Sequence, residues 1–225
     1  MRFETHLHTA IGSYDGAIQI EELVAWVLAS GIGGVCITDH DCVLSNRDIR
    51  ALRESTGAIV VRGVEVTTNM GHVLTYGLDE YVPGIHDIRV LRREVDKVGG
   101  AMVLAHPFRS DVSPYYTYGD APRGLPPWEE VLARPVFQYV DALEACNGSG
   151  VLEEETLVRR AANDLGLAVT GGSDAHKANK LGLCITQFTD YLSSERDFIE
   201  AIRSGVCNGI DLRTHGKAGE EKRAD

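Results

Sequence analysis

The chain has 225 residues, of which 44% are hydrophobic and 24% charged, as is typical of one globular domain with a full core. Its formal net charge of −11 argues against a broad surface for duplex DNA, because such a surface needs basic residues to displace counterions. Five cysteines without a CxxC pair, an N-terminus that leads straight into a histidine motif, and the lack of an apolar run that could span a bilayer predict a cytoplasmic protein with no signal peptide and no membrane contact.

Strand-like and helix-like segments alternate along the chain. The apolar runs predict strands over 2–8, 34–38, 58–66, 72–78, 101–105, 141–146 and 167–170, the third of them interrupted at Arg62-Gly63. Amphipathic spacing predicts helices over 20–30, 45–56, 87–98, 153–165 and 194–204, and most of these end at a glycine.

These repeated strand–helix units with short connections predict a parallel sheet in one domain over residues 1–212. Candidate ligands at the end of almost every strand fit a closed barrel better than an open sheet, because a ring of strand ends converges on one mouth. Residues 109–127 hold four prolines and are expected to form a long loop over the strand ends, which is a candidate lid. The charged segment 213–225 is expected to be a disordered tail.

Two pairs of candidate metal ligands are each spaced two residues apart. The first pair is His6 and His8, and the second is Asp174 and His176. Side chains at positions i and i+2 of a strand point to the same side, so each pair can hold one ion. A single pair is also compatible with ordinary polar strand residues, but two independent pairs favour a metal site.

Five further candidates follow other predicted strands or a turn near the first pair. A carboxylate at the end of an apolar strand is costly unless it is paired or bound to a metal. The alternatives are a salt bridge for Glu65, a half-buried strand position for His72, a turn for Asp15, and for His40 a helix cap or a position behind the ligands. The five candidates are Asp15, His40, Glu65, His72 and His106.

The ordered set HxH, Asp, TDH, GVE, GH, AHP and SDAH resembles the PHP family, named for polymerase and histidinol phosphatase, over residues 2 to 210. The resemblance implies an α/β fold, a distorted (β/α)7 barrel of the TIM-like type, with phosphoesterase chemistry at three divalent ions. Mixed nitrogen and oxygen ligands suit Mn, Zn or Fe. The resemblance assigns ion one to His6, His8, Glu65 and Asp174, ion two to Glu65, His72 and His106, and ion three to Asp15, His40 and His176.

Phosphoryl transfer also needs a cation that stabilises charge on the phosphoryl oxygens. Arg109, three residues after His106, is the first candidate for this catalytic and substrate-binding role, and Lys177 is a second substrate-binding candidate. A solvated surface charge is the alternative for both. His40 and Asp39 are both candidates for protonating the leaving group, and Asp39 is also a candidate for fixing an imidazole.

A few other residues leave alternatives open. Glu144 and Asn147 follow another predicted strand and fit either a role at the mouth or a structural role in a turn, while His86 and His215 are expected at the surface. Four aromatic residues fit either stacking on a ring of the substrate or packing of the loop onto the barrel. These are Tyr115, Tyr116, Tyr118 and Trp128.

Three functions compete for these residues. The first is a phosphoesterase that acts on a small phosphomonoester, a nucleotide or a short oligonucleotide; histidinol phosphate is one substrate of the family. The second is an amidohydrolase or deaminase that cleaves a C–N bond, which the lack of a bridging lysine at a strand end disfavours. The third is a regulatory metal-binding PHP module, which the complete ligand set disfavours.

Overall fold

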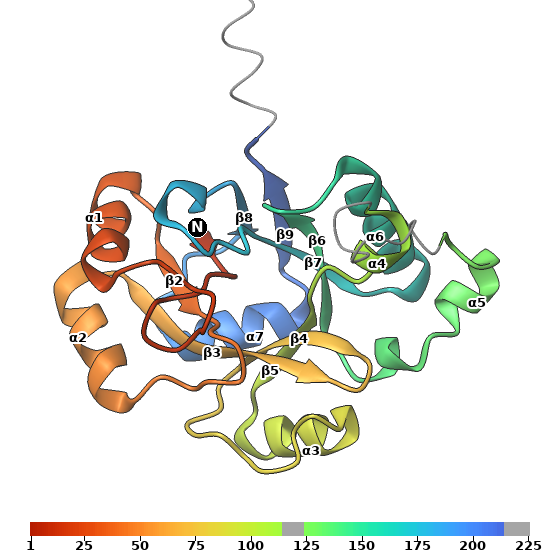
Figure 1. Cartoon of the computed structure of the whole chain (residues 1–225), viewed down its shortest axis with the longest axis horizontal. Coiled ribbons are helices and arrows are strands. Elements are labelled where there is room, and N and C mark those ends of the chain that lie inside the picture. Colours follow the sequence, from red (N-terminus) through yellow and green to blue (C-terminus); the bar gives the residue numbers. More distant parts are fainter. Residues whose placement is uncertain (114–123, 214–225) are drawn as a thin grey trace, which may run out of the picture.

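Nine strands form one continuous sheet that curls into a barrel, and the helices lie around its outside (Figure 1). The computed structural model describes residues 1–113 and 124–213. The strands are β1 (Arg2–Glu4), β2 (Gly34–Ile37), β3 (Ile59–Thr68), β4 (Gly71–Tyr76), β5 (Ala101–Leu104), β6 (Ala142–Asn147), β7 (Ala168–Gly172), β8 (Cys184–Phe188) and β9 (Cys207–Asp211). In the sheet they follow the order β7-β6-β5-β4-β3-β2-β1-β8-β9.

The helices cover the sheet from outside, and the five long ones were expected from the sequence. The helical elements are α1 (Ile20–Ser30), α2 (Asn46–Thr56), α3 (Ile88–Val98), α4 (Arg109–Val112), α5 (Trp128–Leu132), η1 (Pro135–Gln138), α6 (Leu152–Leu165), η2 (Ala178–Lys180) and α7 (Glu195–Ser204). Ser45 caps α2 by accepting from the backbone N–H of Asp48. The five long helices all end at a glycine in the left-handed conformation. No helix in the described part of the chain has the length and apolar character that a bilayer crossing requires.

The α/β barrel prediction is confirmed, but the sheet is mixed and not wholly parallel. β4 pairs antiparallel with both β3 and β5. Only Asn69 and Met70 separate β3 from β4, and so short a connection can join only antiparallel strands. The expected break at Arg62-Gly63 is absent, because the buried Arg62 side chain is paired with Asp79 and bonded to Asn46 while β3 continues through it.

The antiparallel pair of β8 and β9, which α7 separates in the chain, was not predicted, and it completes the wall between β1 and β7. β8 pairs antiparallel with β1 and with β9. β9 lies so close to β7 that a Cβ atom at Gly209 would stand 2.3 Å from the carbonyl oxygen of Thr170. Glycine is therefore required at this approach.

The segments that follow β1 and β7 pair with each other and close the barrel at its mouth. Leu7 forms a parallel bridge with Ala175. The backbone N–H of His8 donates to the carbonyl of Ala175 at 2.9 Å, and that of Ala175 donates to the carbonyl of His6 at 3.3 Å. The closure sets the two pairs of predicted ligands side by side, with the buried Leu7 and Ala175 between them.

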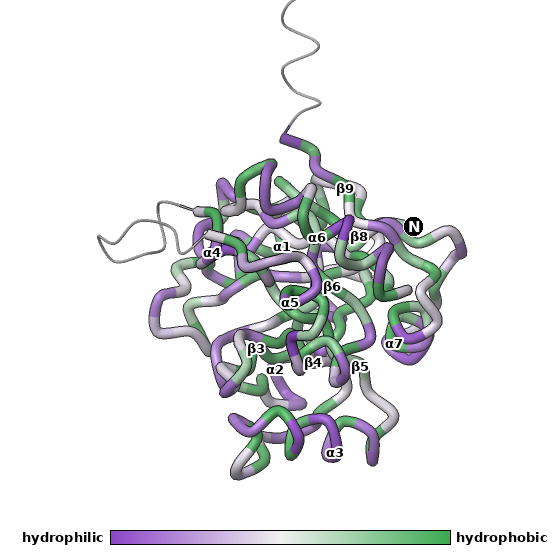
Figure 2. Tube along the Cα trace, turned by 90° about the vertical axis from the view of Figure 1, so that its right-hand side faces the viewer, coloured by the Kyte–Doolittle hydropathy of each residue, from purple (hydrophilic) through white to green (hydrophobic). Residues whose placement is uncertain are grey.

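Apolar side chains fill the space between the sheet and its helices. Figure 2 shows hydrophobic positions along the central strands and hydrophilic positions on α3 and α7. One core cluster joins β1 to α7 through the rings of Phe3, Phe188 and Phe198, whose centroids lie 5.2 to 5.4 Å apart. Tyr76 packs against Phe198 and donates its hydroxyl to the carbonyl of Thr5 at 2.9 Å, which ties this core to the start of the HxH segment.

Two predicted segments lie partly outside the described residues. The loop predicted over 109–127 begins with the short helix α4, and residues 114–123 of the candidate lid are outside them. Arg213, expected in the tail, donates to the carbonyls of Gly148 and Gly150. The remainder of the predicted tail, 214–225, also lies outside the described residues.

Glu154 in α6 gives a test of the packing behind the barrel mouth. Burial raises the pKa of its carboxyl to about 7. An acid whose pKa is higher in the folded than in the unfolded chain loses folding stability as the pH rises from about 4.5 to 7. We expect Glu154→Gln to gain on the order of 1–3 kcal/mol relative to the wild type between pH 5 and pH 8. Urea unfolding of both proteins at the two pH values measures this.

The matched control is Glu153→Gln, because Glu153 lies in the same helical turn but is exposed. This control should follow the wild type at both pH values. An unchanged pH dependence in Glu154→Gln would show that the burial of this carboxyl is not costly.

Candidate metal centre

One carboxylate oxygen marks the centre of the site at the barrel mouth. Glu65 Oε2 lies 3.3 Å from His6 Nε2, 3.2 Å from His8 Nε2 and 3.1 Å from His40 Nδ1. The atom is buried and has no hydrogen-bond partner, although three ring nitrogens surround it. A buried oxygen without a partner is costly. Nitrogens that converge on it without forming hydrogen bonds are arranged as ligands around shared cations, so the residues fit a metal site.

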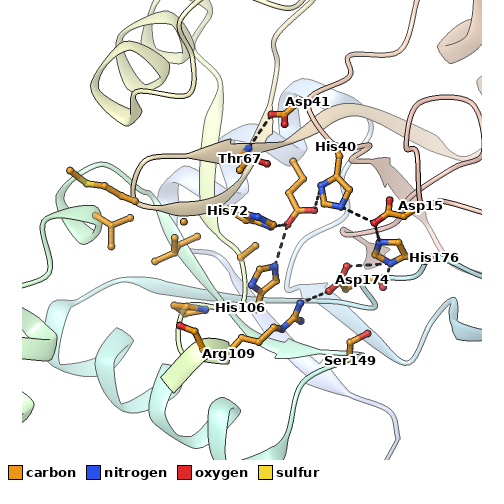
Figure 3. Close-up of a pocket in the computed structure, with 18 of the residues that line it drawn as sticks. Asp15, His40, Asp41, Thr67, His72, His106, Arg109, Ser149, Asp174 and His176 are labelled. Carbon is orange, nitrogen blue, oxygen red and sulfur yellow. Dashed lines mark hydrogen bonds and ion pairs between the residues drawn. The ribbon is translucent and has the colours of Figure 1, made fainter. Parts of the chain in front are cut away.

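The other oxygen of Glu65 faces two further imidazoles. Oε1 lies 2.9 Å from His72 Nδ1 and 3.2 Å from His106 Nε2. Figure 3 shows His72 and His106 on the side of the site away from Asp15. Because the two oxygens face different sets of rings, Glu65 can bridge two ions, as the sequence suggested.

Asp174 contributes the second buried carboxylate. Its Oδ1 atom lies 3.5 Å from His6 Nε2 and 3.3 Å from His8 Nε2. Asp174 and His106 both have positive φ angles, of 50° and 32°. Such conformations cost about 1–3 kcal/mol each in a non-glycine residue and gather at functional sites, where the surrounding structure enforces them.

Asp15 and two imidazoles form the outer edge of the site. Asp15 Oδ2 lies 3.2 Å from His176 Nε2 and 3.6 Å from His40 Nε2 (Figure 3). The sequence placed Asp15 here by its spacing from HxH alone. Its side chain is 35% exposed, so a ligand that it holds would be open to solvent.

The potential ligand atoms group into overlapping sets around Glu65. Within each set, one ligand atom per residue lies within 4.8 Å of the others. The sets are His6, His8, Glu65 and Asp174; His40, Glu65 and His72; and His8, His40 and His176. The first set is the group that the sequence assigned to ion one, and the other two share members with ions two and three.

The imidazole of His6 and the carboxylate of Glu65 each shift the pKa of the other toward its charged form. Burial would lower the pKa of His6, but Glu144, Asp174 and Glu65 outweigh it and raise that pKa well above the usual range. Burial would raise the pKa of Glu65, but the charge of His6 and the hydrogen bonds with His106 and His72 hold it well below the usual range. The site therefore keeps its carboxylates ionised and balances them with cations, either protons or metal ions.

Further residues orient the ligands from behind. Glu144 Oε1 accepts from His6 Nδ1 at 2.8 Å, which leaves Nε2 of that ring to face the site. Ser13 Oγ lies 3.1 Å from His8 Nδ1 and accepts from the backbone N–H of His40 at 2.9 Å. Ser13 lies in no recognised motif, and no signal in the sequence identified it.

Asp39 is buried below the site. It accepts from the backbone N–H and the hydroxyl of Thr9, at 2.5 and 2.7 Å, and is absent from the described lining of the pocket. Burial raises the pKa of its carboxyl. Both of its oxygens hold the segment that carries Ser13, so its position fits the orienting role and offers no direct path to a leaving group.

Arg109 is not a loop residue but begins the short helix α4, where it is buried. Its guanidinium donates to Asp174 Oδ2 at 2.9 Å and to Asn147 Oδ1 at 2.6 Å, and it lines the pocket (Figure 3). Asn147 also donates to Glu144 at 2.8 Å, so these two strand-end residues join the ligand network. Lys177 is exposed beside His176 and is not among the lining residues.

The remaining candidates lie away from the ligands. His86 is exposed, as expected, and bonds to the carbonyl of Thr67. Trp128 stacks under the guanidinium of Arg160 at 4.0 Å and donates to Asp164, so its ring packs against α6. Tyr14, which the sequence analysis did not select, borders the pocket and faces His40. Tyr115, Tyr116, Tyr118 and His215 lie outside the described residues.

Comparisons with known proteins agree on one family. A model of the PHP domain matches residues 4–163, and a PHP-associated model matches residues 153–207. The "Probable phosphatase" of Caldicellulosiruptor bescii is 25% identical over 221 residues, which cover 88% of both chains.

Solved structures show the same fold at low identity. A two-domain protein from Bacteroides vulgatus that contains a predicted PHP-like metal-dependent phosphoesterase gives a TM-score of 0.67 at 18% identity; the alignment covers 94% of this chain and 64% of that protein's length. An amidohydrolase from Chromobacterium violaceum gives a TM-score of 0.62 at 17% identity, with 90% of this chain and 97% of that chain covered.

The contact between Glu144 and His6 gives a testable prediction. Glu144→Ala should weaken binding of Mn²⁺ by about 10–100-fold, because His6 loses the partner that fixes its ring. Titration calorimetry with Mn²⁺ on chelator-treated protein measures the affinity. Exposed Glu21→Ala is the control and should bind as the wild type does. Unchanged affinity in Glu144→Ala would remove Glu144 from the ligand network.

Proposed function

The chain belongs to the PHP domain family, and from that premise we propose that it is a metal-dependent phosphoesterase that hydrolyses a small phosphorylated substrate at three divalent ions. The observation that carries this proposal is the carboxylate of Glu65, whose two buried oxygens face five imidazoles and whose Oε2 atom has no hydrogen-bond partner. The relative named a phosphatase covers most of the chain and supports the same reaction class.

We assign the ions to three ligand groups, the first two of which share Glu65. Nitrogen and oxygen donors without sulfur suit Mn, Zn or Fe. When bound, the divalent ions supply Lewis acids and lower the pKa of water toward neutrality. The proposed groups are His6, His8, Glu65 and Asp174 for ion one, Glu65, His72 and His106 for ion two, and Asp15, His40 and His176 for ion three.

The protein's own residues orient the substrate and its charge. The guanidinium of Arg109 lines the pocket while Asp174 and Asn147 hold it in place. A fixed cation at this point stabilises the negative charge that builds up on the phosphoryl oxygens without having to move during the reaction. Arg109 therefore contacts the substrate from one side and fixes a proposed metal ligand from the other.

The positions of His40 and Asp39 support different roles for the two residues. His40 lines the pocket, and its two ring nitrogens face Glu65 and Asp15, which suits a ligand better than a proton donor. Asp39 holds Thr9 and stays away from the pocket. We therefore propose His40 as a ligand of the outer ion and Asp39 as a positioning residue behind it.

The pocket at the barrel mouth has a volume of about 810 Å³, which accommodates a small phosphomonoester, a nucleotide or the end of a short oligonucleotide. Substrate size alone does not separate these three classes. A C–N hydrolase remains a weaker candidate, although one structural neighbour is an amidohydrolase. No lysine is found among the described residues that line this pocket, so the carboxylated-lysine bridge of many such enzymes has no counterpart there.

Release of inorganic phosphate tests the proposal. Protein supplemented with Mn²⁺ is incubated with histidinol phosphate, nucleoside monophosphates, a nucleoside 3′,5′-bisphosphate and a 5′-phosphorylated short oligonucleotide. We expect turnover of at least one of them that a chelator abolishes. Asp174→Ala should lower kcat/KM by ~1000-fold or more, because both an ion and Arg109 lose their partner.

The control for that variant is Asp164→Ala, on the outside of α6. Circular dichroism should show that both variants are folded. Turnover in Asp174→Ala close to that of the wild type would contradict the assignment of ion one, and the absence of any phosphate release from metal-loaded protein would contradict the proposed reaction class.

A further inference from the structure

The pocket has two chemically different parts. One part is the ring of potential metal ligands around Glu65, and the other is an apolar arm that leads away from His72 and His106. Figure 3 shows a group of side chains drawn in carbon alone, and one containing sulfur, on the side of these two histidines away from Asp15 and His176. The walls of this apolar arm are Met70, Leu104, Pro107, Val136 and Phe137.

The fold fixes the walls of the apolar arm. Leu104, Val136 and Phe137 belong to the largest core cluster, and Met70 packs against it. Each of the three is less than 8% exposed. Met70 and Leu104 each lie two residues before a proposed ligand of ion two, His72 and His106. A group attached to a phosphate at the ions would therefore enter an apolar space whose shape is set before binding.

Both arginines that line this pocket already have a carboxylate partner. Arg134, which also lines the pocket, donates to Asp111 at 2.9 Å and lies 5.3 Å over the ring of Phe108. Arg109 is held by Asp174 and Asn147, and its proposed partner is the phosphoryl group at the ions. Among the described lining residues these are the only arginines or lysines. A second phosphate or carboxylate on the substrate would therefore lose its water in the arm without gaining a dedicated partner.

We propose that the substrate of this chain is a phosphomonoester of a compact, uncharged, apolar alcohol, whose aromatic or branched aliphatic group fills the apolar arm. This inference rests on the proposed function and narrows its substrate class. Water supplies the hydroxyl group that bonds to phosphorus, the ester P–O bond breaks, and the alcohol leaves with one proton. The products are inorganic phosphate and the free apolar alcohol.

Two esters with leaving groups of similar acidity test this inference. Benzyl phosphate fills the arm with a phenyl ring, whereas 2-hydroxyethyl phosphate places a polar group there. We expect kcat/KM of the Mn²⁺-loaded protein to favour benzyl phosphate by on the order of tenfold or more. A nucleoside 3′,5′-bisphosphate, which carries a second phosphate, should fall below benzyl phosphate as well.

A variant in the wall locates the preference. Met70→Gln keeps the length of the side chain but places an amide against the ring, so the preference for benzyl phosphate should fall by about three-fold or more. Exposed Leu28→Gln on α1 is the matched control and should keep the wild-type preference. Binding of benzylphosphonate and 2-hydroxyethylphosphonate to the metal-loaded protein, measured by calorimetry, gives the same comparison without turnover.

The outcomes separate the two proposals. If the wild type prefers the benzyl compounds and this preference falls in Met70→Gln, the apolar arm is supported as the specificity site. Equal use of both esters, or preference for the hydroxyethyl ester or the bisphosphate, overturns this inference while the phosphoesterase proposal stands. If no ester is hydrolysed, the proposed function fails, and the phosphonate affinities alone decide whether the arm selects an apolar group.

Discussion

The parallel bridge between Leu7 and Ala175 is the contact on which the site depends. It joins the segment after the first strand of the chain to the segment after the seventh, and thereby closes the barrel at its mouth. Because both bridging residues are buried, the histidines and the aspartate next to them are directed into one small volume. Neither ligand pair could complete an ion site without this closure.

The closure also creates an electrostatic problem that shapes the surrounding structure. Two buried carboxylates, Glu65 and Asp174, face imidazole nitrogens in a space that excludes most water. Charges in such a space are costly unless they are balanced. Arg109 balances one side of Asp174, while Glu144 fixes His6 from behind. The residues that surround the site therefore supply partners for the charges at its centre.

Much of this arrangement was predictable from the sequence, because local patterns carry it. Helix periods, glycine caps and the apolar strands are local, and the i, i+2 spacing of two ligand pairs states which side chains share a face. The direction of β4 was also encoded locally, since the two-residue connection at Asn69 and Met70 requires an antiparallel pair. The pair of β8 and β9 was missed because α7 lies between the two strands, so that their pairing is not local in the sequence.

The residues behind the ligands were less predictable. Ser13 and Asp39 act through contacts across 27 and 30 positions of the chain, which no short pattern records. Arg109 was recognised as a cation near the mouth, but its burial against Asp174 depends on helix α4 and on the closure of the barrel. The apolar arm likewise joins β4, β5 and the segment at Val136, so it emerges only from the folded chain.

Anomalous diffraction from crystals soaked with Mn²⁺ tests the central claim, that Glu65 is the centre of a three-ion site. We expect three peaks at the barrel mouth, two of them in contact with the carboxylate of Glu65 and the third beside Asp15. Loss of both inner peaks in Glu65→Gln crystals would support the bridging role. Peaks elsewhere in the molecule, or a mouth that stays empty at saturating Mn²⁺, would contradict it.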